Sequence, residues 1–152
     1  MSKHTLTSQQ RRAWLTLTGM LTKLPTALDA EMANEADLTF FEYMVLSTLA
    51  EEPDGVLKMS ILAERTNGSL SRLSHVVRRL ENQGLVERHG SPQDRRVTNA
   101  VLTPAGRQRV EAAAPGHVRY VRDLVIDGTS EDDLEVFERV SAGILERLTS
   151  AV

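Results

Sequence analysis

The 152-residue sequence contains no cysteine, which excludes disulfide bonds, thiol-based redox switches and metal sites with cysteine ligands. Aromatic residues make up only 4% of the chain, and no apolar run approaches the roughly 20 residues that a membrane-spanning helix needs. Residues 1–10 also lack the apolar segment of a secretory signal. We therefore expect a protein that stays in solution in the cytoplasm.

Catalytic and metal-binding motifs are also missing from the sequence. The four histidines have no HxxxH or HxH spacing, and the chain has neither a glycine-rich phosphate loop nor a nucleophile elbow. We expect no enzymatic activity, no cofactor and no metal. With 41% hydrophobic residues, the chain can bury one core and is most simply read as a single domain.

Long amphipathic helices are predicted at both ends of the chain. Apolar residues recur at spacings of three and four over residues 8–33 and again over residues 130–149, which is the period of one helical face. These stripes either pack on the chain's own core or join two subunits. Their members are Trp14, Leu17, Leu21, Leu24 and Leu28 in the first helix, and Leu134, Phe137, Val140, Ile144 and Leu148 in the last.

Between these helices the pattern changes to short elements. Thr39 and Glu42 have the spacing of a capping box and predict a helix over 37–50, followed by a short strand at 56–58. Ser60 is expected to cap a short helix over 61–66, and Ser69 to cap another that ends near Gly84. This pair of short helices with a tight turn between them is a helix-turn-helix pattern.

The helix after Ser69 has two different faces. Leu73, Val76, Val77 and Leu80 form one apolar stripe that we expect in the core. The other side carries hydroxyl, guanidinium, imidazole and amide groups, which are donors suited to phosphates and base edges. We predict that this face contacts DNA through Ser69, Ser71, Arg72, Ser74, His75, Arg78 and Arg79.

A β-hairpin wing is predicted next. Residues 85–88 and 97–102 alternate as two strands, with a loop over 89–96 that ends in Asp94, Arg95 and Arg96. Thr103 followed by proline then predicts the start of another helix, with an interruption or kink at Pro115-Gly116. The fold class is therefore mainly α with a small β-hairpin wing.

Positive charge is concentrated in this central segment. Residues 58–109 hold ten basic and four acidic residues, a net +6, whereas the whole chain carries −3 and the remainder therefore −9. A basic segment on an acidic protein suits a polyanion-binding surface. We add Arg88 and the wing residues Asp94, Arg95 and Arg96 to the predicted DNA contacts.

The order of these elements resembles the MarR family of bacterial transcription regulators. The resemblance lies in Leu62-Ala63, in residues 69–81, in Gly84-Leu85-Val86, in Asp94-Arg95-Arg96 and in residues 102–106, and it covers nearly the whole chain. It implies a winged helix-turn-helix lobe over residues 38–103 and dimerisation helices over residues 1–34 and 104–152. It also implies a homodimer on a pseudo-palindromic operator in double-stranded DNA.

The resemblance further assigns roles to single residues. In the family's wing, an aspartate orients the arginine two residues later into the minor groove, which here implies Asp94 and Arg96; Arg95 would then favour the phosphate backbone. Many members are repressors that small aromatic or lipophilic compounds release from DNA. Trp14, Leu17, Tyr43 and Met44 are candidates to line such a ligand crevice, although residues of this kind are also common in a core.

Two other functions are compatible with parts of the pattern. Winged helices also serve as protein-interaction modules, but such a docking face should show exposed aliphatic or aromatic residues rather than Ser, Arg, His and Asn. An enzyme or a metal-dependent protein is disfavoured by the missing motifs.

Overall fold

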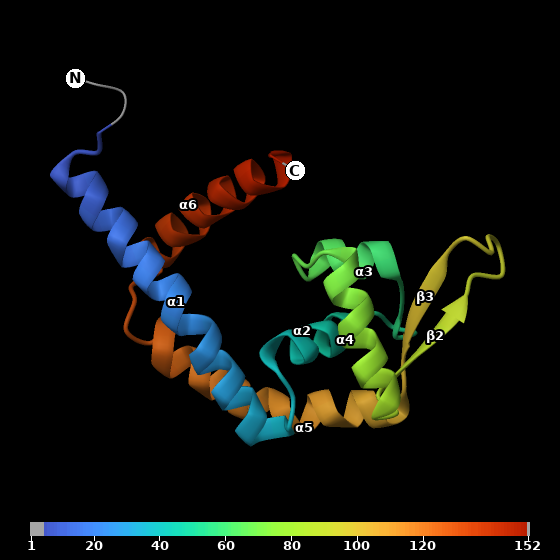
Figure 1. Ribbon diagram of the computed structural model, residues 1–152. Helices are drawn as coiled ribbons and strands as arrows, with labels where there is room; N and C mark the ends of the chain where they lie inside the picture. The colour runs from blue at the N-terminus through green and yellow to red at the C-terminus, as the bar shows by residue number, and fades with distance from the viewer. Residues whose placement is uncertain (1–4, 152) are drawn as a thin grey trace. The chain divides into compact units, whose positions relative to one another are not determined.

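A computed structural model of the chain describes residues 5–151 (Figure 1). Its elements, in chain order, are α1 (Ser8–Ala36), α2 (Phe40–Glu51), β1 (Val56–Lys58), α3 (Met59–Arg65), α4 (Leu70–Asn82), β2 (Val86–Gly90), β3 (Thr98–Leu102), α5 (Pro104–Val121), the π-helical turn η1 (Arg122–Ile126) and α6 (Glu131–Ser150). The expected fold class, mainly helical with long terminal helices and a small wing, is confirmed.

The wing belongs to a three-stranded antiparallel sheet with the order β1-β3-β2. Val56 of β1 pairs with Val101, and Val86 of β2 pairs with Leu102, so β3 lies in the middle. The predicted strand end at Arg88 is wrong, because the ladder continues through His89 to the pair Gly90–Thr98. The wing loop therefore starts at Ser91, whose N–H donates to the Val97 carbonyl.

The core lies where the short helices meet this sheet. Buried side chains come mainly from α2, α3, α4 and the strands, with Met32 of α1 and Ala113 of α5, and the whole predicted stripe of α4 is among them. Figure 1 shows α2, α3 and α4 gathered beside the strands. The largest fully buried side chains are Met32, Leu46, Leu49, Leu62, Leu73, Leu80, Leu85, Val45, Val77 and Val86.

Two of the three predicted helix caps in this region are confirmed. Thr39 and Glu42 form a complete capping box at α2, and the Ser69 Oγ accepts the N–H of Arg72 at 3.1 Å. The predicted cap at Ser60 is wrong. Because α3 starts directly after β1 and buries Met59, Lys58 is the N-cap residue and Ser60 lies inside the helix.

The expected interruption at Pro115-Gly116 is not found. Pro115 lies inside α5, which continues to Val121, and the regular helix gives way only at the following π-helical turn. A proline removes one backbone donor, and the rest of the 18-residue helix retains its ladder.

The structure divides into a unit that ends at Ala114 and a second unit that begins at Pro115. The first unit contains the core and the winged helix-turn-helix. In the second, Gly116 is the one residue buried within 115–151, and α6 has no buried residue at all.

Candidate nucleic-acid interface

Helix α4 presents the predicted polar face to solvent. Ser71, Arg72, His75, Arg78 and Arg79 are all exposed, while the opposite stripe is buried. A groove of about 630 Å³ runs along this face and is lined by Ser69, Ser71, Arg72, His75, Val76, Arg78 and Arg79. The structure thus brings six of the seven predicted helix residues together in one groove; Ser74 is half-buried and faces the wing.

The wing loop holds an arginine in a fixed orientation. Arg96 donates from Nε to Asp94 Oδ1 and from Nη2 to Asp94 Oδ2, both at 3.1 Å, and its backbone N–H donates to Oδ1 at 3.0 Å. These bonds from Arg96 lower the pKa of the Asp94 carboxyl, so the carboxylate stays charged. The Arg96 side chain remains 90% exposed, which leaves its outer edge free to approach a polyanion.

Arg88 has a different environment from the one expected. Its guanidinium makes a bidentate pair with Glu81, at 2.9 Å from Nε and 3.1 Å from Nη2, and Nη1 reaches the Ser74 hydroxyl at 3.5 Å. The pair lowers the pKa of Glu81 and raises that of Arg88. Since Glu81 belongs to α4 and Arg88 to β2, the pair braces the helix against the wing.

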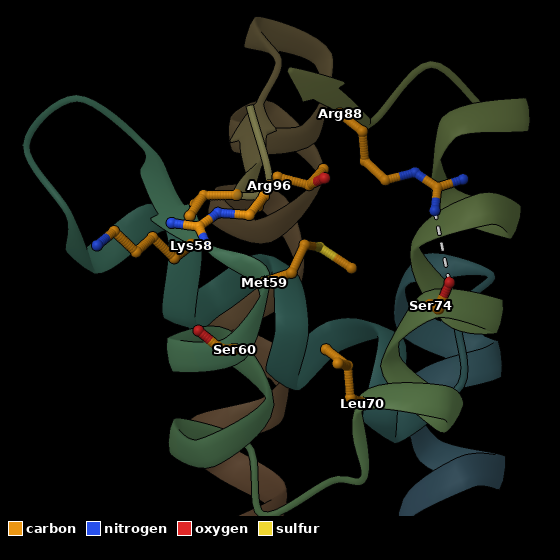
Figure 2. Close-up of a pocket in the computed structure, with 9 residues that line it drawn as sticks. Lys58, Met59, Ser60, Leu70, Ser74, Arg88 and Arg96 are labelled. Atoms are coloured by element: carbon orange, nitrogen blue, oxygen red, sulfur yellow. Dashed lines mark hydrogen bonds between the residues drawn. The ribbon is translucent and has the colours of Figure 1, made fainter. Parts of the chain in front are cut away.

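A second cavity, of about 320 Å³, lies between the two helices of the motif and the wing (Figure 2). Its polar groups come from Lys58, Ser60, Ser74, Arg88, Arg96 and Thr98, and Figure 2 shows the bond between Arg88 and Ser74. Sequence analysis missed Lys58 and Ser60 as candidates. They reach this place because β1 pairs with β3, which lies 40 residues further along the chain, and no local pattern reports that pairing.

Arg79 also has a partner within the fold. Its Nε lies 3.1 Å from Glu42 Oε1 in an ion pair, and the other oxygen of this buried carboxylate accepts the Thr39 N–H at 2.8 Å. One carboxylate therefore caps α2 and ties it to α4. The Arg79 side chain is still 57% exposed and lines the groove.

Some of the positive charge in the central segment is used elsewhere. Arg107 donates to the carbonyl of Ala50 and Arg109 to that of Ala36, the carbonyls at the ends of α2 and α1. Arg65 pairs with Glu51 and Glu52. These three arginines stabilise the fold, so the net charge of the segment overstates the charge on the exposed face of α4 and the wing.

One of the four candidate ligand-binding residues lines the cavity beside α1 and α2. A cavity of about 370 Å³ borders α1, α2 and the start of α4, and Met44 is the one candidate among its lining residues. Trp14 is 54% exposed, Leu17 is half-buried, and Tyr43 lies in the core, where burial raises its pKa. The cavity is lined instead by Leu21, Leu24, Pro25, Leu28, Asp29, Phe40, Phe41, Met44, Thr66, Asn67 and Arg72.

Within residues 5–151, no three His, Asp or Glu side chains are grouped as metal ligands would be. None of the helices described there is both long and apolar enough to cross a membrane.

Comparison with known proteins identifies the family. A model described as "MarR family" matches residues 36–97. Sco3205, a MarR family transcriptional regulator from Streptomyces coelicolor crystallised in complex with DNA, is 33% identical over 97% of this chain and 92% of its own, with a TM-score of 0.92. The chain belongs to the MarR family.

Two further relatives agree with this assignment. AbsC, another MarR family regulator of S. coelicolor, is 34% identical over 97% of this chain and 99% of its own, with a TM-score of 0.91. The transcriptional repressor YetL of Bacillus subtilis is 26% identical over 71% of this chain, and the match spans 64% of the length of YetL. A MarR family protein is a DNA-binding transcription regulator and not an enzyme. The family therefore confirms the expected regulatory function and the expectation that the protein is not an enzyme.

Proposed function

We propose that this protein binds a pseudo-palindromic operator as a homodimer, represses transcription there and releases the DNA when a small molecule binds. The observation that carries the proposal is the exposed polar groove of α4 beside a wing arginine that Asp94 holds in place. In this arrangement α4 reads base edges in the major groove and Arg96 enters the minor groove.

The dimer is supported by the exposed apolar side chains of the terminal helices. Trp14 and Leu21 of α1 are 54% and 57% exposed, and Phe137, Val140 and Leu148 of α6 are 50%, 51% and 61% exposed. A helix whose apolar stripe has no buried member requires a partner surface. A second copy would cover this stripe and present two α4 helices to successive major grooves.

Repression is supported by a relative of this chain, and ligand release by a cavity in its fold. YetL is a repressor, and a protein that covers a promoter blocks transcription by occupying it. The 370 Å³ cavity combines a mainly apolar wall with Arg72 and Asn67 near the start of α4, and its one carboxylate, Asp29, accepts the Phe40 N–H. A small aromatic compound with an anionic group directed at Arg72 suits this lining. We place the protein in the cytoplasm, where chromosomal DNA is accessible.

The test starts from a random-sequence duplex library. Purified protein should enrich a duplex with two inverted half-sites about one helical turn apart. In an in vitro transcription reaction, the protein should lower the amount of RNA made from a promoter that carries this duplex. A panel of small aromatic acids should include one that raises the melting temperature and releases the duplex. Failure to enrich any sequence would contradict specific DNA binding.

A further inference from the structure

Arg72 has a partner that none of the other arginines of α4 has. The Cζ atom of Arg72 lies 4.0 Å from the centroid of the Phe41 ring, which is cation–π geometry. We propose that Phe41 is a positioning residue for DNA reading and that its ring holds the Arg72 guanidinium in the orientation used to recognise a base. This inference rests on the proposed function.

The kind of contact matters because of what it leaves free. Stacking on a ring occupies the flat face of a guanidinium, and its N–H donors point outward along the edge, where a guanine is bound bidentately. Arg88 instead donates to Glu81 from Nε and Nη2, and the Nε of Arg79 is in an ion pair with Glu42. The Phe41 ring therefore holds the Arg72 side chain without a hydrogen bond from its guanidinium.

The Phe41 ring is itself fixed by the turn of the motif. A Cβ atom at Gly68 would lie 2.7 Å from Phe41 Cζ, closer than carbon atoms approach, so only glycine leaves room for the ring there. The turn is held by the Gly68 N–H, which donates to the Ala63 carbonyl at 3.0 Å, and by Asn67 in the left-handed conformation. The turn between α3 and α4 thus fixes the ring from one side.

The backbone of Arg72 is fixed independently. Its N–H donates to the Ser69 hydroxyl at 3.1 Å, which sets the first turn of α4. With the backbone capped and the guanidinium stacked, the flexible stem between them has both ends restrained. Most of the conformational-entropy cost of fixing this side chain is then incurred when the protein folds. DNA binding does not incur this cost again and is stronger by that amount.

The same pair connects two cavities. Arg72 lines both the groove on the DNA-facing side of α4 and the 370 Å³ cavity, and Phe41 lines the latter. A compound that displaces the ring from inside the cavity would remove the support of Arg72 at the groove. Phe41 would therefore couple binding of a compound in the cavity to the position of Arg72 on the face of α4 that reads DNA.

The experiment compares single substitutions on the duplex enriched by the wild-type protein. Phe41→Leu keeps an apolar side chain and removes the ring face, and the specific duplex should bind roughly 3- to 10-fold more weakly, with a random duplex unchanged. Phe40→Leu is the matched control, because it removes the neighbouring ring from the same cavity and leaves the Arg72 stack in place. Melting curves of each variant report the folded state.

A double-mutant cycle decides whether Phe41 acts through Arg72. In an Arg72→Ala background, Phe41→Leu should have no further effect on affinity, and both single variants should relax the same base position in a new selection. Gly68→Ala should do the same by displacing the ring, and it provides a second route if Phe41→Leu fails to fold.

Two results would overturn this inference and leave the proposed function standing. One is that Phe41→Leu binds the duplex as tightly as wild type and has a wild-type melting curve. The other is that Phe41→Leu lowers the affinity by the same factor in the Arg72→Ala background as in wild type. A wild-type protein that enriches no duplex would overturn the proposed function together with it.

Discussion

The arginines of the winged helix-turn-helix lobe differ in what their N–H donors already bind. Arg88 is bound to Glu81 by two donors and is half-buried, whereas Arg96 is bound to Asp94 by two donors and is 90% exposed. The first arrangement suits a brace between α4 and the wing. The second suits a side chain that is presented to DNA with its orientation already fixed.

We expect the wing pair to act as one unit. Arg96→Ala should weaken specific binding roughly tenfold or more, because it removes a charge from the minor groove. Asp94→Ala should reproduce part of this loss by freeing the Arg96 rotamer, so the double variant should lose less than the sum of the two effects. Binding is measured by fluorescence anisotropy, and neither substitution should change the melting curve.

Arg95→Ala is the control for this experiment. Arg95 is the exposed neighbour of Arg96 and has no Asp94 contact among the bonds described above. It should show simple additivity with Asp94→Ala. Full affinity of Arg96→Ala would contradict a DNA-reading wing.

The brace between Glu81 and Arg88 should make stability depend on pH. The bond from Arg88 lowers the pKa of Glu81 below its ordinary value of 4.5, so the folded state favours the charged carboxylate. The resulting stability is present above that ordinary value and is lost as the pH falls through the lowered pKa. Glu81→Gln should therefore be less stable than wild type in urea at pH 7, with the difference shrinking below about pH 4.

Glu64→Gln provides the comparison, since Glu64 is an exposed glutamate of α3 that lies outside the brace. It should change the free energy of unfolding little at either pH. A difference for Glu81→Gln that stays constant from pH 7 to pH 3 would argue against the charged pair as its source.

At the scale of elements, one joint holds the wing, α4 and α5 together. The Thr103 hydroxyl donates to the Gly84 carbonyl at 2.7 Å and accepts the Gly106 N–H at 3.0 Å. Gly106 lies so close to the backbone just before β2 that a Cβ there would be 2.2 Å from the Leu85 carbonyl oxygen. The start of α5 is thereby fixed to the end of α4 and the beginning of the wing.

Gly106→Ala should therefore destabilise the protein although alanine favours helices. The backbone of α5 or β2 would have to move, at a cost of about 1 to 3 kcal/mol or more. Gly90→Ala, at a position with open space, is the matched control and should stay within about 1 kcal/mol of wild type. The free energies of unfolding in urea check both values, and equal stability of the two variants would show that the joint can relax.

Local signals predicted these elements well because caps and apolar periods act over a few residues. Thr39, Ser69 and Thr103 have the predicted capping bonds, and α1 extends three residues past its expected end at Ala33. The Ser60 cap failed because burial of Met59 decided where α3 begins.

The site was less predictable than the fold, since its contacts join residues far apart in the chain. Lys58 reaches the wing cavity through a strand pairing, and the Phe41–Arg72 stack crosses 31 residues. Neither leaves a periodic pattern in the sequence. The exposure of a side chain on α4 could be derived from its position around the helix. The residue that the side chain contacts could not.

At the scale of the whole molecule, we expect α6 to be covered by a second copy. Glutamate at Phe137 or Val140, both about half exposed in the single chain, should place charge in the dimer interface and give monomers in sedimentation. Ala142→Glu places the same charge on the polar side of α6, about 140° from Phe137, and should leave the dimer intact. Monomeric wild-type protein at micromolar concentration would contradict the dimer.

The salt dependence of DNA binding measures how much charge the whole dimer presents. If the two subunits neutralise about 6 to 10 phosphates, affinity should fall roughly 10³- to 10⁵-fold between 50 and 200 mM salt. Arg95→Ala, which changes one exposed arginine in each subunit, should reduce the slope by about two. Arg65→Ala removes the same charge from the same basic segment, yet its guanidinium is paired with Glu51 and Glu52. It should leave the slope unchanged, and an equal effect of the two substitutions would mean that the net charge of the segment, rather than the exposed face of α4 and the wing, attracts the DNA.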